Sequence, residues 1–347
     1  MAAELRVSSR EAVRFAIIVL GLLVCPMTAV AGAGVTQGVP LRNQNPFLQI
    51  FGLPPFQSAQ LATRNAFDLQ MSVDIVNHAD SATTATEDAV IDGESYFLTV
   101  SMRRSLSDRL EVGFDLPLVS HQEGFLDSAI KDWHDLLGLS NSKRRGVNDQ
   151  LAYRYSSGGQ TLYELDSPTA GIGDIQLTAA MPLRKADEAS ALSVSLRSAI
   201  KLPTGSADEL SGSGAADFSL GLYASNSYRL WQRDLDLSGF AGALLLGDGD
   251  VLPDLQRSAV PYGGLAASYW IADRFGISMQ LQLEGPYFDV DVAEIGGSSA
   301  QFAVGFDYRL RQHGTSLHLS ITEDIAAATT ATPDFGIHFS VRKTERQ

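Results

Sequence analysis

The sequence has a single cysteine, and that residue lies in a part of the chain that we expect to be removed. Cys25 falls within residues 1–31, where a basic start, the apolar run 15–24 and the motif Ala29-Val30-Ala31 predict a cleaved signal peptide. The apolar run is shorter than the roughly 20 residues that a membrane-spanning helix needs. The mature chain therefore has no thiol, which excludes disulfide bonds and cysteine chemistry.

Basic residues are also scarce. The chain has 26 Lys and Arg against 40 Asp and Glu, and loss of residues 1–31, with three Arg and two Glu, changes the net charge from −14 to −15. A chain this acidic is not expected to bind nucleic acid. Its six histidines show no metal-ligand spacing and it has no glycine-rich phosphate loop, so we expect no metal and no cofactor.

Long apolar runs are missing downstream of the signal peptide, and short alternations of polar and apolar residues replace them. In the stretch AFDLQMSVDIV, residues 66–76, every second side chain is apolar, which predicts a strand with one apolar and one polar face. Twelve such stretches occur, and many are close to the roughly 9–11 residues that cross a bilayer at a tilt. They are residues 66–76, 96–102, 109–118, 174–183, 192–202, 217–228, 235–246, 260–271, 275–284, 301–310, 316–322 and 334–341.

The connections between these stretches alternate between short and long. Export without a membrane helix leaves a soluble β protein or a membrane barrel, and regular alternation of loop length is typical of an up-and-down barrel with short periplasmic turns. We therefore expect an all-β, antiparallel transmembrane β-barrel of about 12 strands over residues 66–341, in the outer membrane of a Gram-negative bacterium. Residues 342–347 would form a C-terminal tail. The expected long external connections are residues 77–94, 119–173, 203–214, 247–259, 285–299 and 323–333.

Four stretches of the chain resemble one family. RNQNPFLQIFGLP at 42–54, GFLDSAIKDWHDLLGL at 124–139, KLPTG at 201–205 and TEDIAAATTATPDFGIHFSV at 322–341 are similar to an uncharacterised family of proteobacterial outer-membrane barrels, the domain-of-unknown-function family 3187. This resemblance implies a location and a barrel form but no activity. The last residue of such barrels is typically aromatic, whereas here RKTERQ ends the chain. This difference affects how the barrel assembly machinery would recognise the C-terminal end.

An irregular apolar segment precedes the first predicted strand. GVPLRNQNPFLQIFGLPPF, residues 38–56, has four prolines and three phenylalanines but no periodicity. Water would leave a large apolar patch exposed, and lipid cannot satisfy irregular backbone. We expect residues 32–65 to form a plug at the periplasmic end of the barrel; a disordered lead or a docking peptide is the alternative. The plug candidates are Arg42, which would pair with a lumenal carboxylate, Asn43, Asn45, Phe47 and Phe51.

The predicted external loop 119–173 is long enough to need a role of its own. Ile130, Trp133 and Leu137 have helical spacing, which predicts a short helix packed over the barrel mouth or, alternatively, a gate or receptor surface. The basic stretch 142–146 suits the phosphates of lipopolysaccharide. Residues 150–165 have the pattern of a hairpin that extends the strands above the membrane.

The polar faces of the strands would line the lumen. Both signs of charge are interspersed there, so a selective pore and an internal salt-bridge network are both compatible with the pattern. The lumen-lining candidates are Asp68, Asp74, Arg103, Glu111, Asp115, Asp174, Arg197, Lys201, Asp217, Glu284, Asp307, Arg309, His318 and His338.

Three functions remain open at this point. The first is a channel or uptake barrel for small solutes, narrowed by the N-terminal segment and by loop 119–173. The second is a plugged, non-conducting structural or interaction barrel. A lipid hydrolase is a remote third, because His318, Ser320, His338 and Ser340 share the lumenal parity, whereas a nucleophile for lipid must be reachable from lipid. The expected partners are the lipid bilayer, lipopolysaccharide and the barrel assembly machinery.

Overall fold

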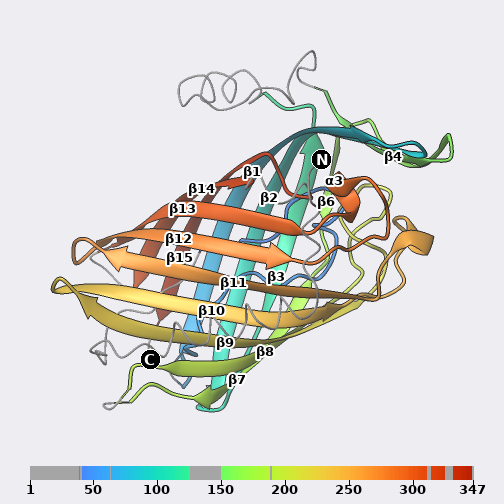
Figure 1. Cartoon of the computed structure of the whole chain (residues 1–347). Coiled ribbons are helices and arrows are strands. Elements are labelled where there is room, and N and C mark those ends of the chain that lie inside the picture. Colours follow the sequence, from blue (N-terminus) through green and yellow to red (C-terminus); the bar gives the residue numbers. More distant parts are fainter. Residues whose placement is uncertain are drawn as a thin grey trace.

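Twelve strands of the computed structural model form one closed antiparallel sheet (Figure 1). Each strand pairs with the next, and the first pairs with the last from Phe67↔Glu345 to Asn77↔Phe335, which confirms the predicted barrel. The structure describes residues 39, 41–62, 64–125, 150–187, 190–310, 314–324 and 331–345. The barrel strands are β1 Phe67–Thr83, β2 Glu87–Ser107, β3 Leu110–Gln122, β7 Gln176–Arg184, β8 Ser193–Lys201, β9 Asp217–Leu230, β10 Arg233–Leu245, β11 Ala259–Trp270, β12 Phe275–Glu284, β13 Ser299–Arg309, β14 Thr315–Asp324 and β15 Phe335–Glu345.

The remaining elements belong to the external connections. The predicted hairpin is present: β4 (Ala152–Ser157) and β5 (Gln160–Leu165) join at Gly158-Gly159, and β4 pairs with the outer end of β2, so the hairpin projects beyond the barrel (Figure 1). The short strand β6 (Thr169–Ile172) pairs with β3. Two short helices, η2 (Pro253–Leu255) and α3 (Ala293–Gly296), lie in later loops. The predicted signal peptide, the residues Ile130, Trp133 and Leu137 of the predicted loop helix, and the basic stretch 142–146 lie outside the described residues.

Three predicted boundaries are wrong, for a common physical reason. β1 and β2 continue through most of residues 77–94, so the expected long loop is a tight turn at 84–86. β3 runs four residues into the expected loop 119–173, and β15 includes residues 342–345 of the expected tail. Beyond the bilayer both faces of a strand meet water or other chain segments. The apolar alternation that identified the strands is therefore lost there although the hydrogen-bonded ladder continues.

The two faces of the barrel wall have the reverse polarity of a soluble protein: apolar side chains point outward and polar side chains point inward. Outward-facing apolar residues are exposed, for example Leu69, Met71 and Val73 at 38, 51 and 40%, whereas the inward-facing Ser72 between them is buried. This arrangement places the apolar belt against lipid and the polar residues in the lumen. Trp270, at the end of β11, faces inward, where its indole nitrogen donates a hydrogen bond to Asp236. Among the described residues no helix is long and apolar enough to cross a membrane.

Residues 41–62, called the plug segment from here on, lie inside the barrel (Figure 1). The segment is neither helix nor strand, apart from a turn over residues 46–50. Its backbone hydrogen bonds are local, such as Leu48 N to Asn45 O at 2.9 Å. Among the described residues, no backbone–backbone hydrogen bond joins the plug segment to a barrel strand. The wall holds it through side chains, so the sheet is complete without it.

Candidate functional site

The apolar side chains of the plug segment are packed against the external loops. Phe51 stacks on Tyr287, with ring centres 5.3 Å apart, and also contacts Phe288. Phe47 meets Tyr163 of the β4–β5 hairpin edge to face at 5.6 Å. Each fully buried phenylalanine contributes roughly 1.5–3 kcal/mol. The segment is therefore held most strongly at the external end of the lumen.

This position corrects the expectation that the segment closes the periplasmic end. The Nδ2 atoms of Asn43 and Asn45 donate hydrogen bonds to the backbone oxygens of Ala331 and Glu294, which belong to external loops. The wall along most of the lumen is polar, and Phe47 and Phe51 find their aromatic partners in the external connections. The segment thus reaches the external loops and then returns to the periplasmic end, where β1 begins.

The returning half of the plug segment follows strands β8, β9 and β10. Phe56 packs on Phe240, with ring centres 5.2 Å apart. The hydroxyls of Ser58 and Ser225 lie 3.3 Å apart, and Ala59 N donates to the Ser225 hydroxyl. Ala62 N then donates to the Glu111 carboxylate at the periplasmic end. These contacts align the segment with one side of the lumen over its full length.

A buried ionic cluster fixes the segment where it comes closest to the wall. Lys201 Nζ lies 2.8 Å from Asp174 and 3.0 Å from Asp217, and it also donates to Ile50 O at 2.9 Å. Asp217 in turn accepts a hydrogen bond from Gly52 N. A Cβ on Gly52 would lie 2.9 Å from the Cβ of Lys201, so glycine permits this close approach. The side chains of the cluster therefore bind backbone groups of the plug segment, at Ile50 and Gly52.

Two sequence motifs meet in this cluster. GIGD (171–174) ends at Asp174 and KLPTG (201–205) begins at Lys201, and the two side chains form the ion pair. The Asp174 carboxylate also accepts hydrogen bonds from the backbone nitrogens of Thr204 and Gly205, at 2.9 and 2.8 Å. A carboxylate with this many donors is well satisfied although it is buried. The pairing of the two motifs across adjacent strands is a signal from which sequence analysis could have found the cluster.

Two arginines, one on the plug segment and one on the wall, form further contacts between them. Arg42 lies 3.5 Å from Asp115, which Arg103 also binds with two hydrogen bonds of 2.8 and 2.9 Å. The predicted pairing of Arg42 with a lumenal carboxylate is thus present in the structure. Arg197 binds Glu111 at 3.1 Å and donates to the side chain of Gln57 and the backbone oxygen of Ser58.

The remaining lumen-lining candidates also face inward. Asp68 is bound by Arg342, Asp74 by His338 and Asp307 by His318. Arg309 lies over the Trp270 ring, and the buried Glu284 accepts a hydrogen bond from Tyr287 at 3.1 Å. The structure therefore places every predicted lumen-lining residue on the inner face. The candidates group into separate pairs and clusters rather than one continuous network. Sequence reasoning missed Gln57, Ser58, Tyr163, Ser225, Tyr287 and Phe288.

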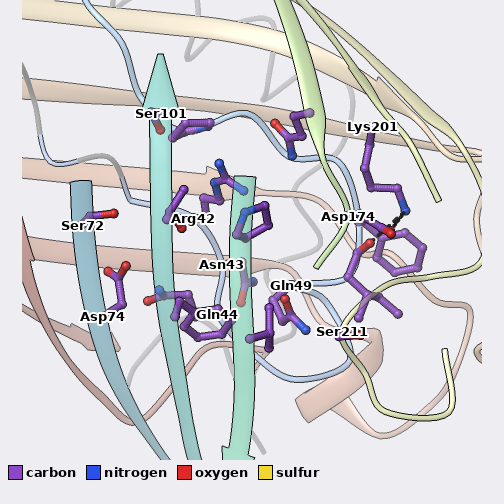
Figure 2. Close-up of a pocket in the computed structure, with 18 of the residues that line it drawn as sticks. Arg42, Asn43, Gln44, Gln49, Ser72, Asp74, Ser101, Asp174, Lys201 and Ser211 are labelled. Atoms are coloured by element: carbon purple, nitrogen blue, oxygen red, sulfur yellow. Dashed lines mark hydrogen bonds and ion pairs between the residues drawn. The ribbon is translucent and has the colours of Figure 1, made fainter. Parts of the chain in front are cut away.

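A small polar cavity of about 60 Å³ separates the first part of the plug segment from strands β1–β3. Figure 2 shows Arg42, Asn43 and Gln44 in the middle, with Ser72, Asp74 and Ser101 on the strands beside them and the Lys201–Asp174 pair on the other side. Polar side chains line it from both the segment and the wall. A cavity with this lining suits water or a small polar solute.

Several solved structures are similar to this chain at low sequence identity. The COG4313 outer membrane channel from Pseudomonas putida F1 is 15% identical with a TM-score of 0.52, and the match covers 84% of this chain and 100% of that one. The NanC porin matches with 8% identity and a TM-score of 0.42 over 81% of this chain and 99% of that one. The toluene transporter TodX of Pseudomonas putida matches with 9% identity and a TM-score of 0.34, over 89% and 98%. No curated protein matches the chain.

A family model identifies the chain more directly than these structures do. The model described as a protein of unknown function, DUF3187, matches residues 16–344, which is nearly the whole chain. The match includes the plug segment, both motifs of the Lys201 cluster and the twelve barrel strands except the last residue of β15. The chain therefore belongs to the DUF3187 family.

Proposed function

We propose that the protein is an outer-membrane channel for small solutes that its own plug segment closes. The observation that carries this proposal is the manner of attachment: side chains, and no backbone–backbone hydrogen bonds among the described residues, connect residues 41–62 to the barrel strands. Departure of the segment would break these side-chain contacts but leave the ladder of the barrel intact. The segment is thus suited to move while the wall stays closed.

The character of the wall supports a hydrated path. The inner face of β8 and β12 carries small hydroxyl groups and amides, including Ser195, Ser278 and Gln280, whose polar atoms have no protein partner among the described residues. Buried polar groups without a partner are costly unless water reaches them. If the barrel only had to enclose an apolar segment, an apolar inner face would give a more stable structure.

The β4–β5 hairpin and the external loops belong to the same closing device. Tyr163 contacts Phe47 through its ring and donates a hydrogen bond to Ala207 O in the loop after β8. Tyr287 and Phe288 hold Phe51 from the loop after β12. A solute or partner that displaced these loops at the external surface would remove most of the apolar contacts of the segment.

A reversible disulfide tests the proposal directly, because the mature chain has no cysteine. Ser58 on the plug segment and Ser225 on β9 have hydroxyls 3.3 Å apart, so the double variant Ser58→Cys/Ser225→Cys can form a disulfide with little movement. The measurement is conductance of the purified protein in planar bilayers, before and after addition of dithiothreitol. Each single cysteine variant is the matched control.

We expect few openings in the oxidised double variant and wild-type openings after reduction, with no effect of the reductant on the single variants. Deletion of residues 34–60 should give a permanently raised conductance. A double variant that conducts equally in both redox states, with the disulfide verified by mass spectrometry, would exclude movement of this segment as the gate.

A plugged, non-conducting barrel is the second candidate, and the buried ionic contacts favour it. The side chains of Lys201 and Asp217 are 1% and 0% exposed, and breaking such a pair is strongly destabilising. In this case the wild type would never conduct, and reduction of the double variant would change nothing. Only the deletion variant would then conduct.

A further inference from the structure

Two histidine–aspartate pairs lie side by side on the inner wall, on strands other than β8, β9 and β10, which hold the returning half of the plug segment. His318 Nδ1 lies 2.9 Å from Asp307 Oδ1, and His338 Nδ1 lies 2.7 Å from Asp74 Oδ1. The four residues come from the adjacent strands β13, β14, β15 and β1. The two imidazole rings are neighbours, with centres 5.7 Å apart. The proposed gate makes no use of this arrangement.

The aspartates determine which nitrogen of each ring is free. An ionised carboxylate only accepts hydrogen bonds, so each Nδ1 carries the proton and each Nε2 of a neutral ring keeps its lone pair. His318 and His338 are 9% and 3% exposed, and neither Nε2 has a hydrogen-bond partner among the described residues. A carboxylate behind Nδ1 is the usual arrangement of a histidine that ligates a metal, because it orients the ring and makes Nε2 more basic.

The spacing of the rings fits one shared metal ion. An Nε2–metal bond of about 2.1 Å puts the ring centre roughly 3.2 Å from the metal, so two ligating rings lie at most about 6.4 Å apart. The observed 5.7 Å falls within this limit. Gly305 on β13 makes room for one ring, since a Cβ there would lie 2.7 Å from His318 Cε1.

The chemistry of the donors selects the class of ion. Imidazole nitrogen suits Zn²⁺, Cu²⁺ and Ni²⁺, whereas Mg²⁺ and Ca²⁺ prefer oxygen. Asp74 and Asp307 balance the two positive charges without ligating. Within the described residues no group of three or more His, Cys, Asp and Glu side chains is placed to hold a metal, so the protein would supply two ligands and water the others. Such a site binds weakly and reversibly.

We propose that His318 and His338 form a binding site for one divalent transition-metal ion on the lumen wall. The binding follows from the residues alone. Its role as a transient binding site for a metal ion or metal complex that passes through the lumen rests on the proposed channel function. The chain spacing of 20 residues between the two histidines gives no metal motif, because only the sheet register makes them diagonal neighbours.

Calorimetric titration of the purified barrel with ZnCl₂ tests the site. The protein should carry no polyhistidine tag and should be treated with EDTA beforehand. The variants are His318→Gln and His338→Gln, singly and together, and the matched control is His121→Gln, another buried lumenal histidine that leaves the pair intact. Titration of Asp74→Asn measures the contribution of the supporting carboxylate.

We expect one Zn²⁺ per chain, binding weakened about 10-fold or more by either single variant, and no binding by the double variant. Asp74→Asn should weaken binding by roughly 10–100-fold. The control should bind as the wild type does, and excess Mg²⁺ should not compete. Bound Cu²⁺ should show two nitrogen ligands by electron paramagnetic resonance.

Absence of Zn²⁺ binding by folded wild type, or equal binding by the double variant, would overturn the assignment. Heat-modifiable migration verifies that each variant is folded. The titration is made in detergent and needs no conductance, so the two proposals fail independently. Zn²⁺ binding to a barrel that never conducts would retain the site and remove the channel, and the reverse result would remove only the site.

Discussion

Lys201 carries its charge into a part of the lumen where its side chain is only 1% exposed. Its ammonium group is compensated by Asp174 and Asp217 and by backbone oxygen, so the cluster as a whole carries one negative charge that several backbone nitrogens stabilise. Removal of the cation would leave two carboxylates facing each other without a counter-charge. The stability of the cluster therefore depends on this single residue more than on either carboxylate.

We predict that Lys201→Met lowers the free energy of unfolding by about 3–5 kcal/mol, the usual cost of breaking a buried ion pair. The measurement is chemical denaturation of the barrel in lipid vesicles, followed by tryptophan fluorescence. Arg229→Ala is the control, because the Arg229–Asp234 pair is partly exposed, at 48% and 22%, and such a pair contributes less than about 1 kcal/mol. Equal losses in the two variants would contradict the assigned importance of the cluster.

Gly52 provides a gentler way to disturb the same contact. A Cβ added to Gly52 would lie 2.9 Å from the Cβ of Lys201 and 3.0 Å from the Cβ of Asp217, so the position has no room for a side chain. We predict that Gly52→Val displaces the plug segment from the wall and increases the open fraction in planar bilayers, while the barrel still migrates as a folded species. Gln60→Val, on a half-buried position of the same segment, should behave as the wild type does.

At the scale of the strand, position along the barrel axis decides what a lipid-facing side chain contributes. Leu319 is 47% exposed and lies at the middle of β14, whereas Leu245 is 51% exposed and ends β10. We predict that Leu319→Arg costs about 2–4 kcal/mol of stability and Leu245→Arg only about 0–1 kcal/mol, since arginine at the end of a strand reaches the interface. Denaturation in vesicles of one lipid composition measures both. A similar loss of stability in the two variants would mean that the middle of the bilayer does not coincide with the middle of the strands.

The strands were predictable wherever one of their faces meets lipid and the other meets the lumen. All twelve were found on this basis, because alternation of Leu69, Met71 and Val73 with polar residues is a strong local signal. The same argument explains the errors. NHADSAT at 77–83 is strand without lipid on either side, so its sequence has no apolar alternation and reads as a loop.

For the plug segment, the sequence predicted the location inside the barrel but not the depth. Its apolar and irregular composition excluded both lipid and water, which was enough to place it in the barrel. Its depth depended on Tyr287 and Phe288, which come from a loop more than 200 residues away and carry no periodic signal. The pairing of Ser58 with Ser225 likewise requires the full register of the sheet and could not be deduced from spacing.

For the whole molecule, a closed sheet without a free edge predicts resistance to unfolding by detergent alone. We expect the protein to migrate faster on gels without heating than after heating, and to fractionate with the outer membrane. Recovery from the periplasm in soluble form without detergent would contradict the barrel as a membrane protein. Identical migration of heated and unheated samples would show that the closed form does not persist in detergent.

The seam between β1 and β15 has a consequence for how the molecule is assembled. Its paired residues, such as Asp74 and His338, are separated by 264 positions, so this ladder has the longest loop-closure distance in the sheet. We expect it to form last. Until then the sheet is curved but open. The plug segment, which precedes β1, can therefore pack against its inner face from the side and need not be threaded through a closed barrel. Closure would then trap the segment, so the order of strand addition also determines that every completed barrel starts out occupied.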